Sequence, residues 1–142
     1  LMLIPYNIVY AATSYPFGKL SDRLGRKRII IAGWGVYSIT YIGFALAAPT
    51  WHVAYVVLLF TLYGVYYGMA EGVTRAFVAD MVPKQRRGTA YGLYYGAVGL
   101  SLLVASVVAG ALWEAVSPAA TFYFGAAMAA AAMLGFAIFI KE

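Results

Sequence analysis

The stretch GKLSDRLGRKR, residues 18–28, holds five of the chain's ten lysines and arginines and separates two apolar runs that carry no charge. One carboxylate, Asp22, lies within it. Its bases are Lys19, Arg23, Arg26, Lys27 and Arg28. A basic cluster between two apolar runs predicts a short loop between two membrane-crossing segments.

The composition supports this interpretation, because 64% of the 142 residues are hydrophobic and 11% are charged. Soluble domains have about 45–50% apolar and about 25% charged residues. A soluble fold of this length could not bury so much apolar surface. The bases interrupt apolar runs instead of forming one polar face, so we expect a lipid bilayer and no nucleic acid as partner. With no cysteine, neither a disulfide framework nor a thiolate metal site is expected.

Five apolar segments lie between the charges, and a membrane-spanning helix needs about 20 such residues. The runs show no period-2 alternation, which argues against strands. The sequence therefore predicts an all-α integral membrane protein with five transmembrane helices, near residues 1–17, 29–50, 53–79, 89–113 and 118–140. The first segment is short and the chain begins inside it, so we expect the chain to be a piece of a longer protein.

Local signals mark the ends of these segments. Pro49 and Thr50 separate the second from the third, and Pro83 precedes the fourth. Ser117 is a candidate N-cap for the fifth.

The distribution of bases predicts the orientation. Residues 18–28, residues 80–88 and the C-terminus fall on one side if consecutive spans alternate, and they carry every Lys and Arg except Arg75. The opposite loops, near 49–52 and 114–118, carry none. Short basic loops stay in the cytoplasm. We therefore expect the cytoplasmic (inner) membrane, with the C-terminus inside the cell.

Positive charge alone does not explain three residues of the first loop. Gly18 could let a helix end approach a neighbour closely. Gly25 could adopt a positive φ and turn the chain back into the membrane. Asp22 could meet the N-terminus of another helix or pair with an arginine.

Residues 18–28 match every defined position of G-x-L-x-D-R-x-G-R-R/K-R/K, and they resemble the cytoplasmic loop signature of the major facilitator superfamily. A second stretch, DMVPKQRRGTAYG at residues 80–92, is similar to the start of the fifth or eleventh helix of that family. The chain ends directly after a span, without a long central linker. The resemblance therefore implies helices 8–12, the C-terminal half without its first helix.

The resemblance also implies a function: secondary active transport of a small solute by alternating access, together with an N-terminal half that is missing here. It leaves the substrate open. The one histidine, His52, lies in the outer loop with no cysteine and no acidic residue nearby, so we expect no metal site, no enzyme and no cofactor. The loop at residues 18–28 would act in conformational gating through Gly18, Asp22, Arg23, Gly25 and Arg26, with Asp22 meeting a helix end of the other half. The alternative is a membrane binding or assembly subunit that uses the same scaffold without transport.

Two ionisable residues, Glu71 and Arg75, lie inside the third span. Four residues apart, they share one helix face and could pair. Three interpretations of Glu71 stay open. It could form a structural ion pair with Arg75 or a relay to Arg26, the relay could form in one conformation only, or Glu71 could carry a proton.

Glycines recur every four residues in the third and fourth segments, a spacing that lets helices pack closely in lipid. These helix-packing candidates are Gly64, Gly68, Gly72, Gly88, Gly92 and Gly96. The contacts could be static or could slide during alternating access.

Tyrosines cluster on the same two segments, where they could line a solute cavity or bond between helices. They are Tyr63, Tyr66, Tyr67, Tyr91, Tyr94 and Tyr95. Asn7 and Thr13 in the first segment could likewise face a cavity or bond to another helix.

Overall fold

The computed structural model describes residues 3–47 and 52–140, and this part of the chain is helical with no strand. The all-α prediction is confirmed. The expected break at Pro49 and Thr50 lies outside the described residues. The helices are α1 (Leu3–Leu24), α2 (Arg26–Ala47), α3 (Val53–Asp80), the short 3₁₀ helix η1 (Lys84–Arg86), α4 (Arg87–Ala115) and α5 (Pro118–Phe139).

The basic stretch 18–28 is not the loop that the sequence predicts. Helix α1 continues to Leu24, and α2 begins at Arg26. The whole turn is made at Gly25, which has a φ of 93° and donates its backbone N–H to the Ser21 carbonyl oxygen at 3.1 Å. This is the conformation expected of Gly25, since a residue without a Cβ adopts positive φ at no steric cost. The charges therefore lie on two helix ends.

The start of α5 matches its sequence signal. The Ser117 hydroxyl accepts a hydrogen bond from the Ala120 backbone N–H at 3.1 Å, and Pro118 occupies the first helical position. The N-cap bond satisfies one of the N–H groups that a helix start leaves without a partner.

Four of the described helices are long and apolar enough to cross a membrane: α2, α3, α5, and α4 taken together with η1. Helix α1 is not among them, although the sequence predicts a span there. Its 22 residues include Asn7, Pro5, Pro16 and a charged last turn, which lower its apolarity.

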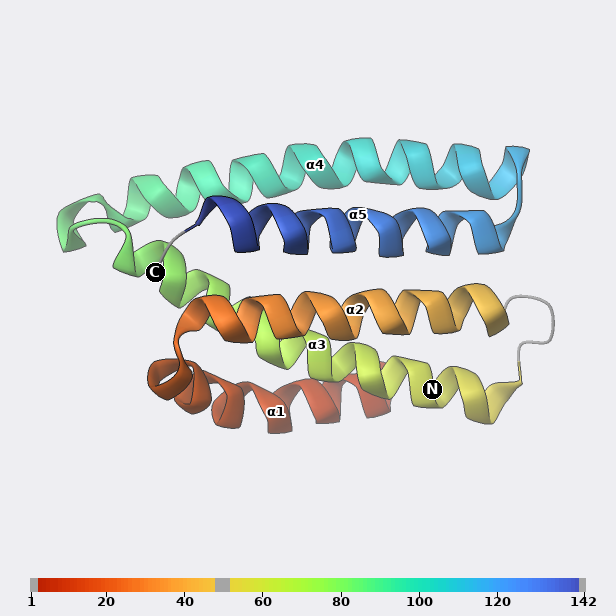
Figure 1. Cartoon of the computed structure of the whole chain (residues 1–142), viewed down its shortest axis with the longest axis horizontal. Helices are drawn as coiled ribbons and strands as arrows, with labels where there is room; N and C mark the ends of the chain where they lie inside the picture. Colours follow the sequence, from red (N-terminus) through yellow and green to blue (C-terminus); the bar gives the residue numbers. More distant parts are fainter. Residues whose placement is uncertain (1–2, 48–51, 141–142) are drawn as a thin grey trace.

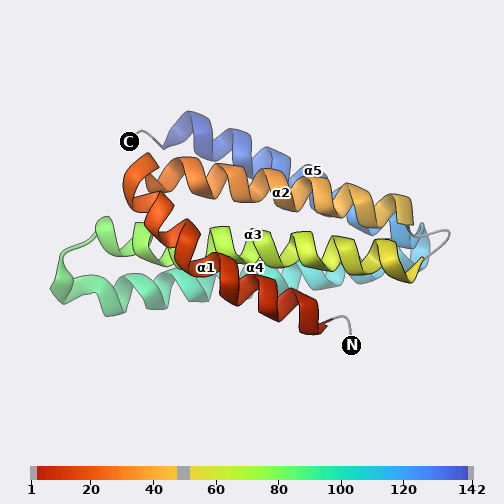
Figure 2. The ribbon, with the colours of Figure 1, turned by 90° about the horizontal axis from the view of Figure 1, so that it is seen from below.

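Helix α3 lies in contact with both α1 and α2, and α2 also packs against α5. Figure 2 shows α1 crossing α3 obliquely. The core between α2 and α3 is formed by Ile29, Ile30, Met69 and Val73, all buried. Phe17 from α1 and Phe136 from α5 pack against it, so four helices share this core.

Helix α4 is different, because none of its residues is buried. Two hydrogen bonds connect it to α3 near its start. The Arg87 Nε donates to the Ala79 carbonyl oxygen at 3.3 Å, and the Tyr91 hydroxyl donates to the Arg75 carbonyl oxygen at 3.1 Å. Near its other end, the Thr121 hydroxyl of α5 donates to the Ala109 carbonyl oxygen at 3.2 Å.

The α1–α2 turn, the α3–α4 connection and the end of α5 lie at the same end of the bundle (Figure 1). We call this the basic end, defined by residues 18–28 and 80–87.

Candidate functional site: an intramembrane ion pair and a tyrosine-lined cavity

Glu71 and Arg75 are the two charged residues of α3 that do not lie at its end. Glu71 precedes Asp80, the last residue of the helix, by nine positions, or about 13–14 Å at ~1.5 Å per residue. A charge near the middle of a membrane-spanning helix costs about 3 kcal/mol or more, so it requires a partner or an aqueous space.

The two side chains satisfy part of that requirement between themselves. A guanidinium nitrogen of Arg75, Nη2, forms an ion pair with Glu71 Oε1. The Tyr10 hydroxyl of α1 donates to the other carboxylate oxygen, Oε2, at 2.6 Å. Both charged side chains stay partly open, with 38% of Glu71 and 45% of Arg75 exposed.

Aromatic rings from α1 and α3 surround the Tyr10 end of this cluster. The Tyr10 ring packs edge-on against Tyr67 with 6.1 Å between centroids, and it stacks on Tyr6 at 6.3 Å. Tyr6 in turn stacks on Tyr63 at 5.8 Å. These contacts fix the hydroxyl that holds the Glu71 carboxylate. The sequence gives no signal for Tyr10 as a partner, since 61 residues separate it from Glu71.

A second charged cluster ties the helices together at the basic end. The Arg26 guanidinium pairs with Asp80 of α3 at 2.5 Å and with Asp22 of α1 at 3.5 Å. Arg26 therefore binds Asp80 and not Glu71 in this structure, so the expected relay from Glu71 to Arg26 is not formed. The reason is distance along α3, because Asp80 lies at the same end of the bundle as Arg26.

The neighbouring base, Lys27, binds the end of α5. Its ammonium group donates to the carbonyl oxygens of Ala137, at 3.0 Å, and Ile140. A helix C-terminus has unpaired carbonyls and a partial negative charge, which a lysine neutralises.

The other gating candidates lie close to this network with fewer contacts. Arg23 is exposed and forms no ion pair with any residue that the structure describes. A Cβ on Gly18 would meet nothing within 4 Å, so the close helix approach expected there is absent from the described chain. Ser21 is the buried residue of this turn of α1, and its hydroxyl donates to the Gly18 carbonyl oxygen at 2.7 Å.

The glycines that recur every four residues on α3 and on α4, which we call the glycine ladders, differ in their surroundings. A Cβ on Gly64 would lie 2.6 Å from the Tyr6 carbonyl oxygen, and one on Gly68 would overlap the Thr13 side chain. These two glycines allow α1 and α3 to touch. The other four, Gly72, Gly88, Gly92 and Gly96, have nothing within 4 Å among the described residues, so the packing expected there is not formed within this part of the chain.

Asn7 and Thr13 bond within their own helix. The Asn7 amide donates to the Leu3 carbonyl oxygen at 2.7 Å, and the Thr13 hydroxyl donates to that of Val9 at 2.7 Å. Within the described part of the chain, neither residue bonds to another helix, which was one of the two possibilities that the sequence left open.

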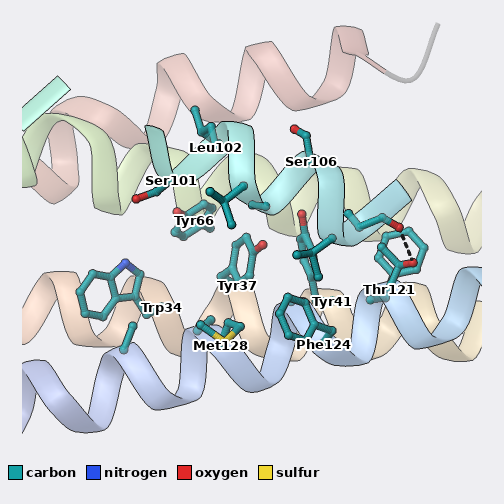
Figure 3. A pocket seen from close by; sticks show the side chains of 18 of the residues that line it. Trp34, Tyr37, Tyr41, Tyr66, Ser101, Leu102, Ser106, Thr121, Phe124 and Met128 are labelled. Carbon is teal, nitrogen blue, oxygen red and sulfur yellow. Dashed lines mark hydrogen bonds between the residues drawn. The ribbon is translucent and has the colours of Figure 1, made fainter. Parts of the chain in front are cut away.

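A cavity of about 990 Å³ lies between α4 and the helices α2, α3 and α5. Figure 3 shows Tyr37, Tyr41 and Tyr66 projecting into it, with Ser101 and Ser106 on the α4 side. Tyr63 and Tyr67 also line it. No charged residue of the described chain lines it, so its chemistry is that of ring faces and hydroxyl groups. Within residues 3–47 and 52–140, no group of His, Asp and Glu side chains could hold a metal ion.

Comparison with known proteins gives several relatives. The chain is 44% identical over 128 residues to an uncharacterized MFS-type transporter of Methanocaldococcus jannaschii, a match that covers 90% of this chain and 31% of the relative. It is 29% identical to an inner membrane transport protein of Escherichia coli over 72% of the chain and 22% of the relative. It is 25% identical to a Na(+), Li(+), K(+)/H(+) antiporter of Planococcus maritimus over 73% of the chain and 25% of the relative.

The chain thus spans about a third or less of the length of these relatives. The family model for the major facilitator superfamily matches residues 1–142. The relatives are named as transporters and not as enzymes, and the described helices are those of a multi-pass membrane protein. This chain belongs to the major facilitator superfamily.

Proposed function

We propose that the complete polypeptide moves a small solute across the membrane as a secondary active transporter that works by alternating access. The observation that carries this proposal is the Glu71–Arg75 pair, which lies inside the membrane span of α3 and stays partly exposed. Ionisable residues inside a membrane span are costly, and they mark solute or ion pathways in many transporters. Membership of a family whose relatives are named as transporters supports the same conclusion.

In this proposal the described helices are helices 8–12 of the transporter, and a separate N-terminal half completes it. The solute would bind between the two halves, which rock about that site. The basic end would act as the gate, through Gly18, Asp22, Arg23, Gly25 and Arg26. Asp22 suits this role because 66% of its side chain is exposed, which leaves it accessible to the other half.

We also propose the cytoplasmic membrane as location, with the basic end and the C-terminus inside the cell. The bases at residues 19–28 and 84–87 support this orientation, since short basic loops stay cytoplasmic.

The second candidate function is a membrane subunit that binds or assembles without transport. No observation favours it, and the names of the relatives favour transport. The antiporter of Planococcus maritimus is consistent with ion coupling, but its 25% identity assigns no ion to this chain.

The test is uptake by the complete transporter in proteoliposomes, with an imposed proton or sodium gradient and a panel of radiolabelled solutes. We expect gradient-dependent accumulation of at least one solute, and a several-fold lower rate for Asp22→Asn. Glu114→Gln, which removes an exposed carboxylate near the end of α4 with the same charge change, is the control. Binding of solutes with no flux under any gradient would instead support the non-transporting subunit.

A further inference from the structure

The neighbours of Glu71 and Arg75 occupy only some of the hydrogen-bond acceptors and donors of these two side chains. Arg75 pairs with Glu71 through Nη2, and its Nε and Nη1 donate to no residue that the structure describes. A guanidinium has five N–H donors, so most of them stay free for a ligand. The Glu71 carboxylate accepts one hydrogen bond from Tyr10 and one from Arg75. The two oxygens of a carboxylate can accept about four hydrogen bonds in total. An unused donor set and an unused acceptor set therefore lie side by side.

The Glu71 carboxylate is held independently of Arg75. Tyr10 belongs to α1, and α1 is fixed against α3 where Gly64 and Gly68 allow close approach. The ring contacts of Tyr10 with Tyr6 and Tyr67 restrict the hydroxyl further. When a ligand draws Arg75 away, the carboxylate keeps its place, and such preorganisation reduces the entropic cost of binding.

The charge balance of the site selects the ligand. A singly charged solute would neutralise one of the two residues and leave the other without a partner inside the membrane, which is unfavourable. A neutral solute would have to compete with the ion pair, and it would offer an opposite charge to neither residue. A zwitterion can satisfy both residues at once. Side chains four residues apart on a helix are about 5–6 Å apart at their Cβ atoms, which suits opposite charges separated by a few bonds.

We propose that Glu71 and Arg75 form the recognition site for a small zwitterionic solute. The ammonium group of the solute binds Glu71, and its anionic group binds Arg75. Tyr10 is a positioning residue that orients the Glu71 carboxylate. This inference rests on the proposed transport function, because it names the substrate class of that transporter.

The experiment uses the complete transporter in proteoliposomes and counterflow of three groups of labelled probes. The zwitterions are the proteinogenic amino acids with uncharged side chains and glycine betaine. The singly charged probes are the methyl esters and the N-acetyl derivatives of the same amino acids. The neutral probes are glucose and glycerol. We expect at least one zwitterion to be exchanged, with at least tenfold lower exchange of its ester and of its N-acetyl derivative.

Variants separate recognition from a structural ion pair. Glu71→Gln and Arg75→Gln should each raise the KM of the zwitterion at least tenfold. The charge-swapped variant E71R/R75E keeps an ion pair at the same spacing but reverses its polarity. We expect it to elute as a single species on size exclusion yet to stay as impaired as the single variants. Tyr10→Phe should raise KM less, by about threefold, at unchanged turnover.

Three results would overturn the proposal. Full transport by the charge-swapped variant would make the pair structural. Exchange of neutral or singly charged probes alone would support the transport function but contradict a zwitterion as the substrate. No exchange of any probe, with intact folding, would contradict the proposed function and this inference with it.

Discussion

Helices α3 and α4 carry the same sequence feature, glycine at every fourth position, but two of the three α3 glycines are closely packed and none of the three α4 glycines is. On α3, Gly64 and Gly68 meet the backbone and side chains of α1. On α4, a Cβ at Gly88, Gly92 or Gly96 would meet nothing within 4 Å. Helix α3 has seven buried residues and α4 has none among those described. The spacing of small residues thus permits close packing, but whether it occurs depends on a partner that the spacing does not identify.

The largest effect is expected when a bulky side chain replaces one glycine on each helix. In Gly64→Leu, the new side chain must displace the Tyr6 carbonyl, so we expect a loss of about 3 kcal/mol in stability. Gly92→Leu on α4 is the matched control, and we expect little change. Equilibrium unfolding of the complete transporter in SDS, followed by circular dichroism, measures both. An equal loss for Gly92→Leu would show that α4 is packed as tightly as α3.

Truncating a large side chain tests the same difference in packing between the α2–α3 core and α4. Ile30 is 1% exposed in the core between α2 and α3, whereas Leu103 on α4 is 65% exposed. We expect Ile30→Ala to cost about 2 kcal/mol, because packing contacts are lost and lipid cannot fill the cavity. Leu103→Ala should be close to neutral in the same unfolding assay. Similar losses in both variants would show that α4 is packed as tightly as the core between α2 and α3.

A smaller effect concerns the basic end, where Arg26 holds α1 and α3. A double-mutant cycle of Arg26→Gln with Asp80→Asn should give a coupling of about 1 kcal/mol, since the groups are partly exposed. The parallel cycle with Asp22→Asn should give less, because that pair is longer, at 3.5 Å, and 66% of the Asp22 side chain is exposed. A larger coupling to Asp22 would mean that Arg26 serves α1 more than α3.

The smallest effect is at the α4–α5 connection. Ser117→Ala removes the hydroxyl that accepts from the Ala120 N–H, and we expect a loss of about 0.5 kcal/mol. Ser106→Ala, which removes a hydroxyl in the cavity wall, is the control for loss of a serine. Unchanged stability in Ser117→Ala would show that Pro118 alone suffices to start α5.

Much of the fold follows from the sequence. The length of each apolar run and the residues Gly25 and Ser117 predict where helices turn and start. The sequence does not predict the helical course of residues 18–24, because a cluster of charges usually indicates a loop between membrane spans, although charges also suit a helix end that leaves the membrane. Local patterns also give no long-range partners: Tyr10 for Glu71, Asp80 for Arg26, and the α5 carbonyls for Lys27 depend on which helices meet.

The site itself was predictable in part. The spacing of Glu71 and Arg75 identifies a possible pair from the sequence alone. Their exposure and their unused hydrogen-bonding groups depend on the faces that α1 and α2 cover, and these faces follow only from the packing of the bundle.

The open face that presents Glu71 and Arg75 depends on α3 lying against α1 and α2. In the structure, a Cβ on Gly33 of α2 would lie 3.8 Å from that of Ala70 on α3, within the usual range for a disulfide of about 3.5–4.5 Å. The most direct measurement is oxidative cross-linking of Gly33→Cys with Ala70→Cys in membranes, in a cysteine-free background of the complete transporter with a protease site between residues 47 and 52. We predict that the two fragments stay joined after cleavage, whereas Gly35→Cys with Ala70→Cys separates. Separation in the first pair, or joining in both, would contradict the position of α3.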